Sequence, residues 1–408
     1  MANPTQNADV PPATPPVIDI DELDDEQDYD DPNITGYWQK LAPLRETLGV
    51  ARLRFGETAG WVLLRHADVM MAFREDSRFS KGAALKPITF PMMGPNIQGY
   101  DGHEHTVHRS FVSPAFRRTA IPRYVEPLLK PLAEELVDEI APLGEADLIT
   151  TFAKHYPMRV ITELLGIPRE DEDKMAAWAK AMLNSVVDPQ GTEQANAEFT
   201  EYVAPLVAQR RARPGEDLLS AIVNEEVEGQ RLDEDHVFGF LRLLFPAGVD
   251  TTWLTLGSLL TAVLQQPDHV RQRLLESESE RSWAIEETVR WEGTTGTEPR
   301  LTMEDVVICD REIPAGQLLR LAVPSANHDP RVFDDPDRWD LGRRPTNHLA
   351  FGLGRHFCLG AFLARGEMNV ALEILLRRLP NLRLTEVPEI YGVVLRGPRS
   401  VRMQWDAP

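Results

Sequence analysis

The feature that most constrains the fold of this chain is a nearly unbroken apolar stretch between Glu234 and Gln266. Large apolar side chains occupy seven of nine consecutive positions near its start, namely Val237, Phe238, Phe240, Leu241, Leu243, Leu244 and Phe245. Such a run predicts a long helix that is buried on most sides. The chain therefore needs a large core around this segment.

The rest of the pattern is mostly helical, with a few short strands. We expect helices through most of the segment from Thr119 to Glu292, and strands at Trp61 to Leu64, around Val306 to Ile313 and around Val393 to Leu395. No Gly/Ser-rich linker and no internal repeat interrupts this pattern. We therefore expect a single domain over residues 35–408.

The first 34 residues have a different composition. Asp19 to Asp31 contains nine acidic side chains in thirteen positions and follows a proline-rich segment, so we expect residues 1–34 to form a mobile tail. This run supplies nine of the 21 net negative charges, which leaves the remainder acidic and unsuited to nucleic acid. Because we find no signal-peptide pattern and no uninterrupted apolar run of bilayer length, we expect a cytoplasmic protein that contacts no membrane.

A glycine-rich loop carries one of the two cysteines of the chain. The loop runs from Phe351 to Gly360, and the apolar periodicity after it predicts a helix from Leu359 to Arg378. Cys358 then lies at the N-terminus of this helix, where the helix dipole and free backbone N–H groups favour a thiolate. A charged sulfur in this place is suited to bind a metal.

Two simpler interpretations of this loop remain open on the residues alone. A lone cysteine is most often a small, buried, apolar side chain. A Gly-x-Gly loop can also hold a phosphate, although Phe357 occupies the position of the third glycine in the dinucleotide-binding pattern.

The long apolar helix contains a polar segment from Ala247 to Thr252. A carboxylate at Asp250 is costly in such a helix unless it is paired, hydrated or functional. Pro246 removes a backbone donor and predicts a local kink. The alternative interpretation is a simple helix bend in which Thr251 bonds back to the preceding turn.

Two further motifs place charged side chains at helical spacing. Glu287 and Arg290 are three residues apart and can pair on one helix face, as many solvated pairs do. His105 and Arg109 are one turn apart in a histidine-rich segment. These histidines could instead form a zinc cluster, but the chain has neither a His-Glu-x-x-His motif nor a cysteine pair to complete one.

Together these segments resemble the cytochrome P-450 superfamily, with matching landmarks from about Trp61 to Gly397. The resemblance implies a mainly α fold with small β regions, and a haem b between the helix of Asp250 and the loop of Cys358. It implies that Cys358 ligates the iron, because a thiolate favours O–O cleavage. In this family Asp250 would relay protons and Thr251 would steady dioxygen.

The resemblance assigns the remaining site residues to three groups. Haem contacts are implied for His105, Arg109, Arg300 and His356, which would reach the propionates, and for Ala247, Phe351, Gly352 and Gly360. The substrate pocket would be lined by Phe90, Met92, Met93, Ile97, Leu243, Thr295, Gly296 and Val394. A structural ion-pair network is implied for Glu287 and Arg290, joined by Arg338.

The implied substrate is a small to medium hydrophobic molecule. The segment from Ile88 to Ile97 corresponds to the loop that roofs the pocket in the family, and it is apolar with adaptable methionines. Many relatives carry a proline where this chain has the segment from Gly293 to Gly296, so we expect a roomier or more flexible wall there.

The function implied by the resemblance is a monooxygenase that inserts one atom of O2 into a C–H bond or a double bond. Electrons would come from a separate ferredoxin of the 2Fe-2S type and its NAD(P)H-dependent reductase, and we expect a monomer. Ferredoxin would dock on a basic patch made of Arg109, Arg117, Arg118, Arg343, Arg344 and Arg355. A peroxide-dependent enzyme and a non-catalytic haem-thiolate sensor or binding protein remain as alternatives.

Overall fold

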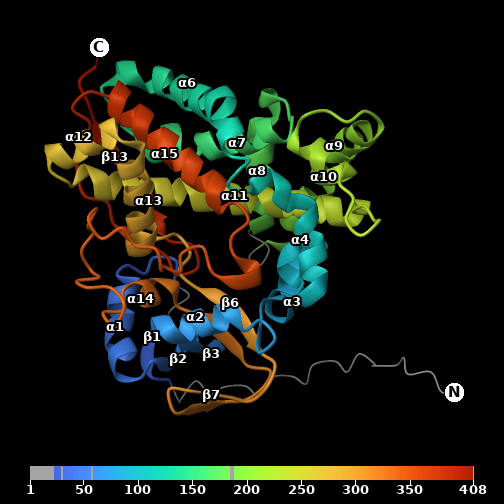
Figure 1. Ribbon diagram of the computed structural model, residues 1–408, viewed down its shortest axis with the longest axis vertical. Helices are drawn as coiled ribbons and strands as arrows, with labels where there is room; N and C mark the ends of the chain where they lie inside the picture. The colour runs from blue at the N-terminus through green and yellow to red at the C-terminus, as the bar shows by residue number, and fades with distance from the viewer. Residues whose placement is uncertain (1–22, 29–30, 57, 184–187, 408) are drawn as a thin grey trace.

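The computed structural model describes residues 23–28, 31–56, 58–183 and 188–407. Most helices gather at one end of the molecule and the larger sheet lies at the other, and the segment before α15 runs between these two regions (Figure 1). The helices are α1 (Tyr37–Thr47), α2 (His66–Arg74), α3 (Lys81–Met93), α4 (Gly102–Phe116), α5 (Pro122–Tyr124), α6 (Lys130–Ile140), α7 (His155–Leu164), α8 (Glu172–Leu183), α9 (Pro189–Ala212), α10 (Leu218–Asn224), α11 (Glu234–Leu264), α12 (Asp268–Glu276), α13 (Glu278–Glu292), α14 (Val323–Asn327) and α15 (Ala361–Arg378). The mainly α fold class is confirmed.

The described strands form one six-stranded sheet and three small ones. The six-stranded sheet has the order β1-β2-β3-β9-β6-β4. The strands are β1 (Asp25–Asp28), β2 (Val50–Phe55), β3 (Thr58–Leu63), β4 (Phe79–Ser80), β5 (Glu145–Asp147), β6 (Glu298–Thr302), β7 (Val306–Ile308), β8 (Arg311–Ile313), β9 (Leu318–Leu321), β10 (Arg383–Leu384), β11 (Ile390–Tyr391), β12 (Gly397–Pro398) and β13 (Arg402–Gln404). Leu319 of β9 pairs with Trp61 of β3 on one side and with Arg300 of β6 on the other.

Helix α11 is the predicted long apolar helix and forms the centre of the helical region. Its first turn is capped by Asp233, whose side chain accepts a hydrogen bond of 2.9 Å from the backbone N–H of His236. The helix continues through Pro246 without a break. By length and composition α11 is also apolar enough to cross a membrane, but 72% of its most apolar window is buried inside the molecule. This burial identifies the apolar run as core.

The boundaries of three predicted elements are corrected by the structure. Most of the expected loop from Ile88 to Ile97 belongs to helix α3, whose first turn is capped by Ser80, which accepts a bond of 2.7 Å from the backbone N–H of Ala83. Of the expected strand around Val393 to Leu395, one antiparallel bridge between Leu395 and Thr295 is present, and the segment otherwise forms the turn between β11 and β12, where Gly392 has a φ of 97°. The expected helix at Leu359 begins two residues later, as α15.

The N-terminal boundary at residue 34 also needs correction. Residues 1–22 and 29–30 of the expected tail lie outside the described residues. The described part of the acidic run includes β1, which pairs in parallel with β2. Asp24 accepts a hydrogen bond of 2.6 Å from the backbone N–H of Arg52 and forms an ion pair of 2.8 Å with Arg311. These contacts make the described acidic segment part of the folded domain.

Candidate active site

The loop before α15 holds Cys358 in a fixed backbone geometry. Gly354 has a φ of 70°, and a Cβ at this position would lie 2.8 Å from the carbonyl oxygen of Phe73, so the close approach requires glycine. The backbone N–H of Cys358 donates to the carbonyl of Phe351 at 2.9 Å. Arg109 of α4 donates to the carbonyl of Phe357 at 2.6 Å. Arg109 therefore fixes the residue directly before the cysteine.

The surroundings of the Cys358 sulfur do not by themselves favour the predicted thiolate. Burial raises the pKa of the thiol, although the backbone N–H of Gly360 and the cations Lys81 and Arg109 act to lower it. The side chain is nevertheless exposed. A bound group can therefore reach this residue. A positively charged group beside the sulfur would stabilise the thiolate.

A cluster of charged side chains lies beside this loop. The rings of His105 and His356 are 4.2 Å apart, and His356 donates from Nε2 to Asp101 Oδ1 at 3.1 Å. Arg300 of β6 is buried and lies 3.6 Å from Glu298. The charges of Arg109 and Arg300 act on the pKa values of His105 and His356, respectively, so the structure brings together all four residues expected at the propionates.

Helix α11 carries the predicted acid and alcohol. Thr251 donates from Oγ1 to the carbonyl of Ala247 at 2.8 Å, which is the predicted bond to the preceding turn. Asp250 accepts a hydrogen bond of 2.9 Å from Nε1 of Trp253. Burial raises the pKa of Asp250 above its ordinary value, while the Trp253 N–H and the charge of Lys154 act in the opposite direction. The carboxyl can therefore hold a proton at a higher pH than a solvated aspartate can.

The predicted ion-pair network is present with a different third member. Arg290 donates from Nε and Nη2 to the Glu287 carboxylate, at 2.8 Å each, and both side chains are completely buried. The third arginine is Arg343, which donates to Glu287 at 3.0 Å. Arg338 was the expected partner, but its side chain is 64% exposed and pairs with Asp335. Its backbone carbonyl faces inward instead, where it accepts from Arg290 at 3.3 Å.

The wall formed by the segment from Gly293 to Gly296 is firmly held. Gly296 N–H donates to the carbonyl of Val394 at 3.1 Å, and Arg396 N–H donates to the carbonyl of Thr294 at 2.8 Å. A Cβ at Gly296 would lie 1.7 Å from the carbonyl oxygen of Val393, so glycine is required for this pairing. Two backbone hydrogen bonds thus tie this wall to the turn between β11 and β12, and the expected roomier or more flexible wall stays a prediction.

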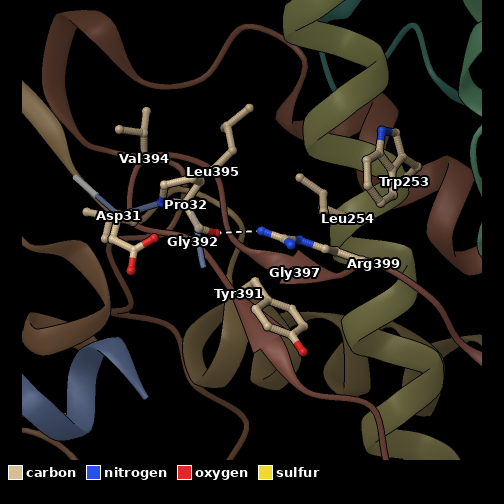
Figure 2. A pocket seen from close by; sticks show the side chains of 11 residues that line it. Asp31, Pro32, Trp253, Leu254, Tyr391, Gly392, Val394, Leu395, Gly397 and Arg399 are labelled. Carbon is tan, nitrogen blue, oxygen red and sulfur yellow. Dashed lines mark hydrogen bonds between the residues drawn. The ribbon is translucent and has the colours of Figure 1, made fainter. Parts of the chain in front are cut away.

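That turn borders a cavity of about 320 Å³ (Figure 2). Val394 and Leu395 come from the turn, Trp253 and Leu254 come from α11, and Arg399 extends across the space to the carbonyl of Pro32 at 2.6 Å. Val394, one of the expected pocket residues, is therefore available to a ligand.

The other expected pocket residues are divided among several environments. The Phe90 ring packs edge-on against Tyr100, with centroids 5.3 Å apart, and Ile97 lines a separate small cavity beside His108. Met93 and Leu243 are buried, and the backbone carbonyl of Met92 accepts from Asn196. The structure does not bring Phe90 and Ile97 together with Val394.

The histidine-rich segment does not form a metal cluster. His103 lies 3.5 Å from Glu228, His105 packs on His356, and His108 stacks on His236. Within the described ranges, no group of three or more His, Cys, Asp or Glu side chains is arranged to hold a metal ion.

Comparison with known proteins decides the family. Residues 282–401 match the family model described as Cytochrome P450. The mycinamicin IV hydroxylase/epoxidase of Micromonospora griseorubida is 36% identical over 380 residues, which cover 90% of this chain and 95% of the relative. The chain belongs to the cytochrome P450 family.

Two further relatives agree with this assignment. The cyclomarin C epoxidase of Salinispora arenicola is 32% identical, over 85% of this P450 and 90% of that protein. The solved structure of the Bacillus subtilis bacillaene polyketide synthase cytochrome P450 PksS superposes with a TM-score of 0.85 at 31% identity, and it covers 91% of this chain and 97% of that chain. The protein is thus a haem-thiolate monooxygenase that binds haem b, as members of this family do.

The residues of this P450 fit a haem between α11 and the cysteine loop. Ala247 is exposed although most of α11 around it is buried, and a Cβ at Gly360 would meet no atom within 4 Å. His105 is buried, and its Nδ1 has no hydrogen-bond partner among the described residues. Open space beside these positions, together with the exposed Cys358 sulfur, is what a flat group with polar edges requires.

Lys81 is a residue of this site that the sequence analysis missed. It lies at the start of α3, is buried, and forms an ion pair of 2.9 Å with Glu298. It also acts on the pKa values of His356 and Cys358, so it lies near both. No motif of the sequence marked it, because its role depends on contacts with Glu298 of another element.

Proposed function

We propose that this P450 is a cytoplasmic, monomeric enzyme that hydroxylates or epoxidises a small to medium hydrophobic substrate, with electrons delivered by a ferredoxin. The names of two relatives, a hydroxylase/epoxidase and an epoxidase, support the reaction class. The observation that carries the proposal is an acid of raised pKa next to a hydroxyl on α11, one turn from the exposed Ala247.

When bound, the haem with its Cys358 ligand supplies the site at which dioxygen is activated. The chain itself must deliver protons there and keep excess water out. Asp250 can hold a proton because burial raises its pKa. The bond from Thr251 Oγ1 to Ala247 fixes the orientation of the hydroxyl, whose lone pairs are then free to accept a further hydrogen bond.

The hydrophobic substrate class is supported by the side chains around the turn between β11 and β12. Val394 is 50% exposed and Leu395 is 39% exposed, although both lie in a part of the fold that is held by backbone hydrogen bonds. Apolar groups that are exposed at a cavity gain free energy when a hydrophobic ligand covers them.

The proposed ferredoxin site is smaller than the six arginines of the sequence suggested. Arg343, Arg344 and Arg355 pair with Glu287, Glu280 and Asp76, respectively, and Arg109 is turned toward Phe357. Arg117 and Arg118, directly after α4, are exposed, and no ion pair of theirs is found within the described part of the chain. We therefore assign the docking contact to these two residues.

Replacement of Thr251 by Ala tests the proposed reaction. We expect the variant to consume oxygen at a comparable rate but to release hydrogen peroxide, with product per oxygen reduced about tenfold or more, because the hydroxyl that directs proton delivery is lost. Oxygen uptake, peroxide and product are measured together for the same substrate.

Thr251→Ser is the matched control, because it keeps the hydroxyl and loses only a methyl group. It should restore most of the coupling between oxygen uptake and product. Unchanged coupling in Thr251→Ala would contradict the proposal and favour a peroxide-dependent enzyme. A protein without turnover under any of these conditions would favour a sensor or binding protein.

A further inference from the structure

Asp250 lies within a small group of side chains that the family resemblance did not assign. Trp253 is one helical turn after Asp250 on α11, and its indole Nε1 donates to Asp250 Oδ1 at 2.9 Å. Lys154, directly before α7, places its Nζ 4.9 Å from the centroid of the Trp253 ring. Helices α7 and α11 pack against each other, which brings the exposed Lys154 beside the partly buried Trp253.

The lysine does not reach the carboxylate directly. No ion pair between Lys154 and Asp250 is present among the residues that the structure describes. The two charges act on one another only at longer range, and no other described charged group acts on the pKa of Asp250. Lys154 instead makes a cation–π contact with Trp253.

The distance between these charges also affects the protonation of the acid, although burial has the larger effect. A direct ion pair in a partly buried site would favour the carboxylate and lower its pKa, because the Coulomb energy rises as the distance falls. The indole ring keeps the ammonium at a distance and offers Asp250 a neutral donor instead. One hydrogen bond to Oδ1 also leaves Oδ2 free to carry a proton.

Trp253 also connects the acid to a space that can hold water. It lines the cavity of about 320 Å³ between α11 and the turn after β11 (Figure 2). This volume is large enough for several water molecules. Water in the cavity would therefore contact Trp253, which is hydrogen-bonded to Asp250.

We propose that Trp253 is a positioning residue for Asp250: its N–H holds the carboxyl, and its ring keeps Lys154 from forming an ion pair with that carboxyl beside the water-accessible cavity. The inference rests on the proposed relay role of Asp250 and deepens it. It predicts that the two parts of the Trp253 side chain, N–H and ring, act on Asp250 in opposite directions.

Three variants separate these effects. Trp253→Phe keeps a ring and removes the N–H, so the pKa of Asp250 should rise by about one unit. Trp253→Ala removes both, so Lys154 can approach and the pKa should fall below that of the wild type. Lys154→Met removes the cation and should raise the pKa by less than one unit. In the double variant Trp253→Ala/Lys154→Met, the pKa of Asp250 should not fall as it does in Trp253→Ala.

The measurement is a pH titration of the carboxyl C=O stretch by infrared difference spectroscopy on the substrate-free, haem-loaded enzyme. Subtraction of the Asp250→Asn spectrum isolates Asp250, so the readout is independent of turnover. An equal pKa in wild type and both Trp253 variants would overturn the inference. An increase in Trp253→Ala equal to that in Trp253→Phe would also overturn it, because the ring would then not keep the lysine away.

Failure of this inference can be told apart from failure of the proposed function. If Asp250→Asn leaves the coupling of oxygen uptake to product unchanged, the relay role fails whatever the titrations show. If Asp250→Asn uncouples the enzyme but the Trp253 variants titrate like the wild type, only the positioning role fails. Should neither Trp253 variant fold, Lys154→Met still decides: a rise in the pKa of Asp250 of about one unit or more would contradict the inference, because that is the effect of a direct ion pair, whereas a smaller rise would support it.

Discussion

At the scale of single residues, Glu367 on α15 is an unusual side chain for a protein core. It is buried, and its Oε2 has no hydrogen-bond partner among the described residues. Burial raises its pKa to about 8, so the folded protein holds it as the neutral acid near pH 7. Unlike for Asp250, no cation in the part of the chain that the structure describes acts on the pKa of Glu367.

This shift predicts how stability depends on pH. Between the ordinary pKa of 4.5 and about 8, the folded state retains a proton that the unfolded state has lost. The free energy of unfolding therefore falls with rising pH, by about 1.4 kcal/mol per unit, through this window. Glu367→Gln should lose this component, so its Tm should exceed that of the wild type by more at pH 8.5 than at pH 5. Parallel Tm curves for the two proteins would contradict the assignment.

At the scale of elements, the network around Glu287 ties α13 to the loop from Pro336 to Arg343. Glu287 and Arg290 are completely buried and pair with one another, and Arg343 forms a second ion pair with Glu287. Removal of one member leaves a buried charge without its partner, which costs about 3–5 kcal/mol. Exposed ion pairs such as those of Arg338 contribute about 0–1 kcal/mol.

Arg343→Ala and Arg338→Ala are a matched pair that tests this assignment. We expect Arg343→Ala to lower the free energy of unfolding by several kcal/mol and to reduce haem retention, because the network supports the segment before the cysteine loop. Arg338→Ala should remain within about 1 kcal/mol of the wild type. Chemical denaturation and the haem content of purified protein report both effects. A larger loss of stability in Arg338→Ala than in Arg343→Ala would restore Arg338 as the third member of the network.

The sequence predicted α11, the Cys358 loop and the Glu287–Arg290 pair, because each depends on local spacing along the chain. It did not predict that Arg343 replaces Arg338, because that choice depends on how the loop turns the Arg338 carbonyl inward. It also missed the turn at Val393, since a positive φ at Gly392 and the close approach of Gly296 arise from tertiary contacts. The proposed role of Trp253 could not be predicted either, because it depends on a contact with Lys154, which is distant along the chain.

At the scale of the whole molecule, charge distribution governs the contact with an electron donor. The chain has a net charge of −21, so an acidic ferredoxin would be repelled by most of its surface. Arg117 and Arg118 are exposed next to each other directly after α4, and α4 is the helix that supplies His105 and Arg109. A local cationic contact in this place would orient the donor toward the haem side of the fold.

The double variant Arg117→Glu/Arg118→Glu should reduce ferredoxin-supported turnover about tenfold at low salt, and the difference should shrink as salt is added. The matched control is Lys180→Glu/Arg213→Glu, which makes the same charge change at exposed positions of α8 and after α9. Turnover as a function of salt is measured for both variants. Equal losses in the two would show that net charge, and not this site, controls the rate.

The absorption spectrum of the ferrous carbonyl complex tests the central claim most directly, namely that the Cys358 thiolate is the ligand of the haem iron. The wild type should give the long-wavelength Soret band of a thiolate-ligated haem, and Cys358→His should retain haem but give the shorter-wavelength band of a histidine-ligated one. A wild-type spectrum with only the histidine-type band, or a thiolate band that persists in Cys358→His, would contradict the account.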